Sequence, residues 1–571
     1  MKTLVIDCAT GDSRREILDR PDLLGPVDAA VRSGFGERDL LLGIGPLHRA
    51  ALPGTHRLVI CGPSELWGGP YISTMGSAGL ALRGLGLDLI QLRNRAERPA
   101  LLHLNPDGAR LQALEPESIW KAGGLPAMLE HALSLASRAG AWALAVGPAA
   151  AVSRFGAVGA GGPGRPGVVE SWAGRGGLGS TLLEHHGVIA ILLDAEPVDT
   201  DTVETGGAAT PIDFRHDPRL GAEGTLAANL GGLADRVLAF NARNTAWPRQ
   251  ERQDLYDRLV QGRLLTQVRE QVQDGSRRRH CGETCPIACR LERDGRRMDF
   301  QPYASLGPNL GIFDLDVVAE VHAFCDAAGF DAVELGGVLA WVLEGRAGDD
   351  PKVSDFDAEA DSRRNGELAL AVARRLLAGE APELAAGLAS AARAAAPEAR
   401  ERALFVGNGE IGGIAPIQFW SPGVLAPGAI AGRYHTYFGV DHVPVERLGR
   451  LCAERAVLEL ALDNLGLCRF QQEWAEGQLS ELYRRAGGGK VDVTAHHRET
   501  ARGLLAGSRP VPWETARARE VVAGHLRACR EAGARDKALE GWIHDFEDDP
   551  EAAAGRYWRA LFEGYREGLL G

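Results

Sequence analysis

Three cysteines spaced four residues apart constrain this sequence more than any other feature. Cys281, Cys285 and Cys289 lie in the segment HCGETCPIACRLE. Pro286 prevents a regular helix through the middle of this segment, so we predict a tight loop that holds three thiols. Iron-sulfur clusters are commonly held by a local group of three cysteines and a fourth from elsewhere in the chain. Cys468, in LDNLGLCRF, follows a glycine that permits a sharp turn at a helix end and is the candidate fourth ligand.

The spacing of these cysteines does not by itself choose the metal. A zinc site built from the three cysteines and His280 is as compatible with the pattern as an iron-sulfur cluster. Three unrelated core cysteines are a further alternative, although such tight clusters seldom arise from packing alone. The preceding arginines at 277–279 would attract an acidic electron carrier, but a charge run is more often a solvated surface. The sequence therefore predicts a metal-binding loop and leaves the metal open.

Composition and the N-terminus indicate where such a protein works. The nine cysteines are an odd number and unevenly spread, which favours metal ligation in a reducing compartment over a disulfide framework. The N-terminus, MKTLVIDCATGD, lacks the longer apolar core of a secretory signal. No stretch reaches the roughly 18 to 20 apolar residues of a membrane helix. A formal net charge of -13 argues against nucleic acid as a partner. We expect a cytoplasmic protein that binds neither nucleic acid nor membrane.

The hydrophobic pattern changes once along the chain. Residues 1–204 contain short β-type runs such as TLVID, HRLVICG and GVIAILL, separated by glycine-rich turns. From 205 onward, apolar residues recur at three- and four-residue steps, as in AVLELALDN, which predicts helices. A chain of 571 residues exceeds what one hydrophobic core usually serves. We therefore predict an α+β protein, with a β-rich N-terminal domain at 1–204 followed by two mainly helical domains at 205–400 and 401–571.

Two segments and one absence complete this pattern. The alanine-rich run at 380–400 predicts an exposed helix. The segment 345–364, rich in Asp, Gly and Ser, predicts a surface loop. No internal repeat of fixed period is evident along the chain.

Four segments occur in an order that resembles the aldehyde:ferredoxin oxidoreductase family: TCPIAC, YASLGPNLGIFDLD, DAAGFD and DNLGLC. The family carries two D-x-x-G-L-(C/D) segments that hydrogen-bond the two pterins of its cofactor. A carboxylate can accept hydrogen bonds from pterin N–H groups, and glycine permits close approach of the backbone. Taken alone, either segment is more often a capped helix end. The resemblance assigns pterin contacts to Asp326, Gly329, Asp331, Asp463, Gly466 and Leu467, and implies that Cys468 binds the cluster.

Glycine-rich stretches of the N-terminal domain match the same family and make this domain the cofactor-binding one. GPLHRAALPGTHR, GGPYISTMGSAGLALRGLGLD and ESWAGRGGLGS parallel loops that surround the cofactor phosphates. Glycine backbones offer N–H donors there, and arginine offers a bidentate charge. A family Asn near a magnesium ion that bridges the phosphates aligns with Ser73, which is still able to ligate. The other residues carried over are Arg57, Gly76, Gly79, Arg175 and Gly176.

The sequence departs from the family at the position of the family's catalytic acid. The family pattern P-E-Y-E-T reads QPYAS here, which places Pro302 and Ala304 at the positions of the glutamates. The segment GRYHTYFG places His435 where the family has its active-site histidine, and His442 is the rival. A histidine can transfer a proton near neutral pH. The resemblance therefore implies catalysis by His435 without the usual glutamate.

Other departures concern metals and charge. The family spaces its first two cysteines C-x-x-C, whereas this chain has C-x-x-x-C. His185 falls near a lysine of the family, which makes the charge there dependent on pH. The family's E-x-x-H iron site between subunits is represented by Glu320 and His322, with the histidine moved by one place. That shift turns a helical side chain by about 100 degrees, so an interfacial iron is not predicted.

Together, these matches imply a cytoplasmic oxidoreductase with a tungsten- or molybdenum-bispterin and a 4Fe-4S cluster held by the four cysteines. Oxidation of an aldehyde, or reduction of a related carbonyl or carboxyl compound, is the implied reaction. Ferredoxin or an iron-sulfur subunit is the implied electron partner, and a homodimer is compatible with the sequence. A catalytically altered or non-catalytic family member is the main alternative. A zinc-stabilised binding protein would use the same cysteines but would leave both pterin segments unexplained.

Overall fold

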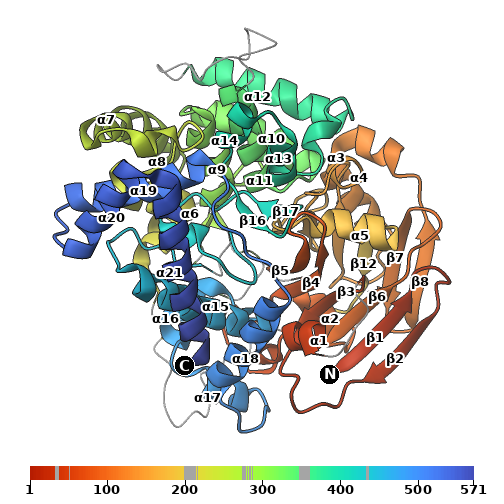
Figure 1. Ribbon diagram of the computed structural model, residues 1–571. Coiled ribbons are helices and arrows are strands. Elements are labelled where there is room, and N and C mark those ends of the chain that lie inside the picture. Colours follow the sequence, from red (N-terminus) through yellow and green to blue (C-terminus); the bar gives the residue numbers. More distant parts are fainter. Residues whose placement is uncertain are drawn as a thin grey trace.

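Two six-stranded β-sheets and a larger, mainly helical part make up the described residues of the protein. The computed structural model describes residues 1–32, 38–50, 52–76, 78–198, 214, 216–272, 278–279, 281, 285, 287, 289–345, 361–432 and 436–571. Figure 1 shows the sheets of the first 200 residues at one side and the helices of the remainder beside and above them. This arrangement confirms the predicted α+β class. Within the described ranges, no helix has the length and apolar character needed to cross a membrane.

The first sheet has six strands in the order β2-β1-β6-β3-β4-β5. β1 and β6 are parallel, and the other neighbours are antiparallel. β3, with the sequence LLLGI, is buried along its whole length, as expected for a central strand covered on both faces. The elements are β1 (Lys2–Asp7), β2 (Ser13–Ile17), α1 (Pro26–Arg32), β3 (Leu40–Ile44), η1 (Pro46–Arg49), β4 (Leu58–Ser64), β5 (Gly69–Met75), α2 (Gly79–Gly84) and β6 (Leu89–Arg93).

The second sheet has six strands in the order β11-β10-β9-β12-β7-β8. β7 and β12 are parallel, and the other neighbours are antiparallel. The apolar runs WALAV and VIAILL form the fully buried central strands. The elements are β7 (Ala100–Asn105), β8 (Gly108–Ala113), α3 (Pro116–Ser134), β9 (Trp142–Val146), α4 (Ala149–Val152), β10 (Val158–Gly161), β11 (Ser171–Ala173), α5 (Leu178–His186) and β12 (Val188–Leu193).

The two sheets repeat one topology. Read from β8, the second sheet has the same strand order and the same pairing directions as the first sheet read from β2. The turn after β3 begins with Gly45 and Pro46, and the turn after β9 begins with Gly147 and Pro148. No repeat is evident in the sequence because the likeness lies in strand pairing and a few turn residues, whereas most side chains differ.

The segment from 216 to 345 adds helices and a small antiparallel sheet. Asp314 accepts hydrogen bonds from the first turn of α10, and Gly329 ends that helix in the left-handed conformation. The elements are α6 (Pro218–Leu233), η2 (Ala234–Arg236), η3 (Arg243–Ala246), α7 (Arg249–Leu255), η4 (Tyr256–Leu265), α8 (Thr266–Val272), β13 (Arg278–Arg279), β14 (Arg290–Arg293), β15 (Arg296–Arg297), α9 (Phe300–Leu306), η6 (Pro308–Leu310), α10 (Leu315–Ala328) and α11 (Ala332–Gly345).

The C-terminal helices pack closely on one another. α15 and α21 lie side by side (Figure 1), and a Cβ added at Gly449 or Gly564 would lie 2.2 Å from a backbone oxygen of the other helix. The elements are α12 (Ser362–Leu377), η7 (Pro382–Leu384), α13 (Leu388–Ala394), α14 (Pro397–Glu401), β16 (Val406–Asn408), β17 (Gly412–Ile414), η8 (Pro422–Leu425), α15 (Val445–Leu465), η9 (Arg469–Gln471), α16 (Gln472–Ala475), α17 (Leu479–Arg485), α18 (Val493–Ala506), α19 (Ala516–Glu531), α20 (Lys537–Asp548) and α21 (Pro550–Leu570).

The alanine-rich run at 380–400 is not the exposed helix that its composition predicts. It forms three short pieces, η7, α13 and α14, and α13 buries most of its length, chiefly against β17. Prolines at the first positions of η7 and α14 separate the pieces. Of the predicted surface loop, residues 346–360 lie outside the described ranges.

Candidate functional site

The predicted cysteine ligands come together from two distant segments. Cys468 follows the end of α15, and its backbone N–H donates to the carbonyl oxygen of Gly54 at 2.8 Å. The cysteines of the loop are close enough to Cys468 to affect one another. The pKa of the Cys285 thiol is raised to about 12, mainly by burial and in smaller part by Cys468 and Cys281, while the backbone N–H of Ile287 opposes the rise. The Cys289 thiol is perturbed in the same direction, first by burial and then by Cys468 and Cys281, which raise its pKa.

The backbone of the first sheet approaches these cysteines at two glycines. A Cβ added at Gly76 would lie 3.1 Å from Cys281 Sγ, and one added at Gly54 would lie 3.2 Å from Cys468 Cβ. Any larger residue at either position would crowd the thiols. Four converging thiols, with glycine backbone beside them, fit the donor set of an iron-sulfur cluster.

The two predicted pterin segments occupy equivalent places in the duplicated scaffold. Gly329 ends α10 and Gly466 ends α15, both with a φ of 78 degrees. A Cβ at Gly329 would lie 2.9 Å from the nitrogen of Gly147, and one at Gly466 would lie 2.9 Å from the nitrogen of Gly45. Only glycine satisfies both the left-handed backbone and this close approach. The segments are therefore helix ends seated on the Gly-Pro turns of the two sheets.

The residues that follow these glycines are equivalent too. The backbone N–H of Asp331 donates to Phe155 O, and that of Cys468 donates to Gly54 O, each at 2.8 Å. Leu467 is buried beside Cys468, as Phe330 is beside Asp331. The scaffold thus presents a carboxylate in one half and a thiol in the other.

Asp326, the acid of the first segment, lies beside a histidine and near an arginine. His322 Nε2 is 3.6 Å from Asp326 Oδ1, and the His322 ring packs on Tyr303 with 4.9 Å between ring centroids. Burial raises the pKa of Asp326, and the charges of His322 and Arg297 oppose that rise. Arg297 also interacts electrostatically with Cys281, so it connects the first segment with the cysteine loop.

Asp463, the acid of the second segment, is buried and paired. Arg469 Nη2 donates to Asp463 Oδ2 at 2.7 Å. Arg469 also pairs with Glu459, which pairs in turn with Arg455. Two arginines therefore balance two acids at the end of α15.

Arg175 contacts Asp331, although the resemblance gives them separate roles at the phosphates and at a pterin. Arg175 Nη1 donates to both Asp331 oxygens at 3.0 Å. Arg175 Nη2 donates to the carbonyl oxygens of Ala415 (2.5 Å) and Gly432 (3.3 Å). The backbone N–H groups of Leu388 and Ala415 donate to the carboxylate of buried Glu334. Burial raises the pKa of Glu334 to about 7, although Arg175 lowers it.

The two glycine-rich loops meet where the sheets adjoin. Gly76 follows β5 and Gly176 follows β11, the equivalent strand of the second sheet. Ser171 Oγ donates to Gly76 O at 2.9 Å across the sheets. Gly176 has a φ of 81 degrees, and a Cβ there would lie 2.2 Å from the ring of Tyr71. Both loops are thus held against the opposite sheet.

The remaining predicted cofactor residues lie near the same loops. Arg57 Nη2 donates to Thr74 O at 3.2 Å and to Thr74 Oγ1 at 3.3 Å. Ser73 is buried on β5, opposite Ile60 of β4. Gly79 begins α2, where a Cβ would lie 2.6 Å from the oxygen of His56.

The predicted catalytic histidine, His435, lies outside the described residues. The described chain before it ends at Gly432, whose oxygen accepts from Arg175. The rival His442 has its Nε2 3.3 Å from an oxygen of Asp536 at the start of α20. In QPYAS, Ala304 is buried within α9, so the chain offers no acid at that position.

The displaced E-x-x-H pair points in two directions. Glu320 is about half exposed and pairs with Arg363 at 2.9 Å, whereas His322 is buried and faces Asp326. The two side chains therefore do not share a ligand position.

His185, which falls near a lysine of the family, lies beside an acid: its Nε2 is 3.4 Å from Glu65 Oε1.

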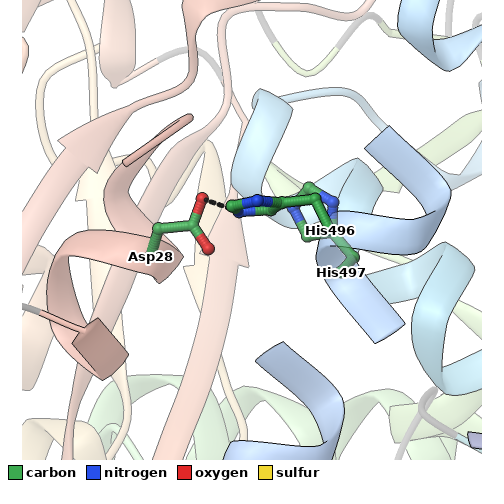
Figure 2. A group of neighbouring side chains, drawn as sticks. All are labelled: Asp28, His496 and His497. Atoms are coloured by element: carbon green, nitrogen blue, oxygen red, sulfur yellow. Dashed lines mark hydrogen bonds and ion pairs between the residues drawn. The ribbon is translucent and has the colours of Figure 1, made fainter. Parts of the chain in front are cut away.

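A group of three potential metal ligands lies beside the second segment. Figure 2 shows His496 pointing at the carboxylate of Asp28, with His497 behind it. His496 Nε2 is 2.9 Å from Asp28 Oδ2. Asn464 Nδ2 donates to both Asp28 Oδ2 (2.7 Å) and His497 Nε2 (2.9 Å). Hydrogen bonds therefore already occupy the facing atoms.

This network fixes Asn464, a residue inside DNLGLC to which the sequence analysis gave no role. Asn464 Oδ1 accepts from the backbone N–H groups of Val27 and Asp28, so its amide group can face only one way. The network ties α1 and α18 to the end of α15. Glu334 and Gln471, each three residues beyond a pterin segment, are two further site residues that the sequence motifs did not indicate. That shared offset was the signal that could have found them.

Comparison with known families covers most of the chain. Residues 26–195 match the family model for the N-terminal domain of aldehyde ferredoxin oxidoreductase, and residues 217–502 match the model for its domains 2 and 3. The chain is 29% identical to glyceraldehyde-3-phosphate:ferredoxin oxidoreductase of Pyrococcus furiosus, with 93% of this chain and 91% of that protein covered. It is 25% identical to a tungsten-containing aldehyde ferredoxin oxidoreductase of Pyrococcus abyssi, over 56% of this chain and 52% of that protein.

A similar fold occurs in a solved structure. It is the active site complex BamBC of benzoyl coenzyme A reductase with 1,5 dienoyl-CoA, with a TM-score of 0.59. The match covers 99% of this chain and 97% of that chain at 14% sequence identity. At that identity, the likeness concerns the fold alone.

Proposed function

Because this chain belongs to the aldehyde ferredoxin oxidoreductase family, we propose that it oxidises an aldehyde, or reduces a related carbonyl or carboxyl compound, at a tungsten- or molybdenum-bispterin. A 4Fe-4S cluster on Cys281, Cys285, Cys289 and Cys468 would relay the electrons. The observation that carries the proposal is the joining of these thiols with two equivalent helix ends, which bear Asp326 and Asp463 on one duplicated scaffold.

The residues have distinct roles in this proposal. When bound, the pterin-held metal supplies two-electron chemistry at the substrate, and the cluster supplies one-electron transfer. Asp326 and Asp463 would accept hydrogen bonds from the pterins. Arg57, Arg175 and the glycine-rich loops at 76–79 and 176 would bind the cofactor phosphates, and Ser73 would help to hold a magnesium ion. Arg175 then serves both the phosphates and Asp331, to which it is already bound.

Proton transfer is assigned to His435 alone. Pro302 and Ala304 offer no carboxylate, so the altered pocket favours a substrate other than that of the family's usual members. The Pyrococcus furiosus relative is named for glyceraldehyde 3-phosphate, which makes phosphorylated aldehydes a first class to test. Ferredoxin is the proposed electron partner, because both relatives are named as ferredoxin oxidoreductases.

Anaerobic purification followed by elemental analysis and EPR spectroscopy tests the cofactors. We expect tungsten or molybdenum together with about four iron atoms per chain and a cluster that dithionite reduces. Zinc alone would replace this proposal with a zinc-stabilised binding protein, and the absence of any metal would reject it.

Turnover tests the catalytic role. A panel of aldehydes that includes glyceraldehyde 3-phosphate is supplied with a viologen dye as electron acceptor. We expect reduction of the dye by the wild type and loss of most activity in His435→Ala. The matched control is His544→Ala, which changes an exposed histidine of α20. A protein that holds both cofactors but turns over no aldehyde would be a non-catalytic family member, a candidate that the missing glutamates favour.

A further inference from the structure

A buried glutamine donates a hydrogen bond to one of the cysteine ligands. Gln471 is 1% exposed and stands at the end of η9, three residues beyond Cys468. Its Nε2 donates to Cys285 Sγ at 3.0 Å. Its backbone N–H donates to Cys468 O at 2.9 Å. Gln471 therefore connects two cysteines that lie far apart in the sequence.

The orientation of this amide is determined by its other neighbour. Trp474 Nε1 donates to Gln471 Oε1 at 2.6 Å, and an indole nitrogen can only donate. The amide oxygen must therefore face Trp474, which leaves the amide nitrogen to face Cys285. Trp474 is itself buried, so water does not compete for this hydrogen bond.

Donors to a cluster ligand favour the reduced cluster. Cys285 also interacts with the backbone N–H of Ile287, so two donors face its sulfur. When a cluster gains an electron, negative charge on the cysteine sulfurs increases, and a hydrogen bond to sulfur stabilises that charge. Each such donor makes the reduction potential less negative.

The equivalent position in the other half of the scaffold holds a hydrogen-bond acceptor instead of a donor. Glu334 stands three residues beyond Asp331, as Gln471 stands three residues beyond Cys468. Glu334 accepts two hydrogen bonds, whereas the Gln471 amide nitrogen donates. A donor is therefore found in the half that holds the cysteines.

We propose that Gln471 sets the reduction potential of the cluster by donating to the sulfur of Cys285, and that Trp474 orients the amide for this purpose. This inference rests on the proposed function, because it requires the cluster. Gln471 is a positioning residue, and it does not touch the substrate.

A redox titration monitored by EPR tests the role of Gln471. Gln471→Leu keeps the bulk of the side chain and removes the donor. We expect a more negative midpoint potential. At a fixed applied potential, the ratio of reduced to oxidised cluster should then be up to tenfold lower than in the wild type. For a one-electron couple, tenfold corresponds to about 59 mV. The control is Gln91→Leu, which removes a buried amide bound to Asp39 in the first sheet and leaves the midpoint unchanged.

Trp474→Phe is the second variant. It removes the indole donor and keeps the Gln471 amide, so we expect a smaller shift in the same direction. An unchanged midpoint in Gln471→Leu with intact cluster content would overturn the inference. If Gln471→Leu loses the cluster, an unchanged midpoint in Trp474→Phe would overturn it instead. A wild type without a cluster would reject the proposed function itself.

Discussion

Arg175 and Asp331 form an ion pair inside the protein, in which one guanidinium nitrogen, Nη1, lies 3.0 Å from each carboxylate oxygen. The two residues stand 156 positions apart, and both side chains are almost completely buried. The pair joins the loop after β11 to the start of α11, so one interaction connects the second sheet to the helical part. The Arg175 side chain also donates to the carbonyl oxygens of two further loops.

Removal of the Arg175 charge should destabilise the fold strongly. Arg175→Met leaves Asp331 buried without its partner, which costs about 3–5 kcal/mol in comparable buried pairs. Chemical denaturation of the purified protein measures this loss. Arg175→Met combined with Asp331→Asn should recover part of it, because Asn keeps an oxygen for the N–H groups of Val333 and Glu334. Equal stability of the single and double variants would contradict this account.

Glu334 should make stability fall as the pH rises. Its pKa is raised from an ordinary 4.5 to about 7 in the folded protein, mainly by burial. Between these values the folded state keeps a proton that the unfolded state has lost, so stability present below pH 4.5 is lost as the pH rises towards 7. Thermal midpoints of the wild type and Glu334→Gln are measured from pH 4.5 to 8, and the wild-type midpoint should fall relative to that of the variant across this window. Parallel curves would rule out this titration.

Gly466 should tolerate alanine less well than another left-handed glycine. Gly379 has a φ of 75 degrees with no atom within 4 Å of an added Cβ, so Gly379→Ala carries backbone strain alone, about 1 kcal/mol. Gly466→Ala has similar strain and adds contacts at 2.9 and 3.0 Å with the backbone of Gly45. We expect the larger loss of unfolding free energy in Gly466→Ala, together with a reduced pterin content. Equal losses in the two variants would show that the close approach has no energetic role.

Cys468 should be necessary for the cluster, whereas Cys452 should not. Both cysteines belong to the α15 region, but Cys452 is buried and its thiol interacts with Gly423 O. Cys468→Ala should lower the iron content and the visible absorption of the purified protein, and Cys452→Ala should leave both unchanged. Equal iron content in the two variants would remove Cys468 from the ligand set.

The sequence predicted the strands and the main division of the chain because local patterns determine them. WALAVG and GVIAILL form β9 and β12, and AVLELALDN lies in α15. The duplication could not be read in this way. It consists of hydrogen-bond pairing between distant strands, and its clearest sequence trace is the two Gly-Pro turns after β3 and β9.

The chemistry of the candidate site was predictable only where residues form short motifs. DNLGLC indicated a helix end with Gly466 in a turn, and the structure has that helix end. The contact of Arg175 with Asp331 depends on two segments meeting in space, and no local pattern specifies it. Gln471 escaped notice for the same reason, since its partner Cys285 lies 186 positions away.

The two halves of the scaffold carry different residues at equivalent positions, so the two ends of the site differ chemically. If the same residue stood two positions after Gly329 and after Gly466, the two halves of the scaffold would present the same chemical group. Instead one side presents Asp331, closed off by an arginine, and the other presents Cys468 among further thiols. The two halves thus share one backbone plan but offer different chemistry, a buried ion pair in one half and a group of thiols in the other.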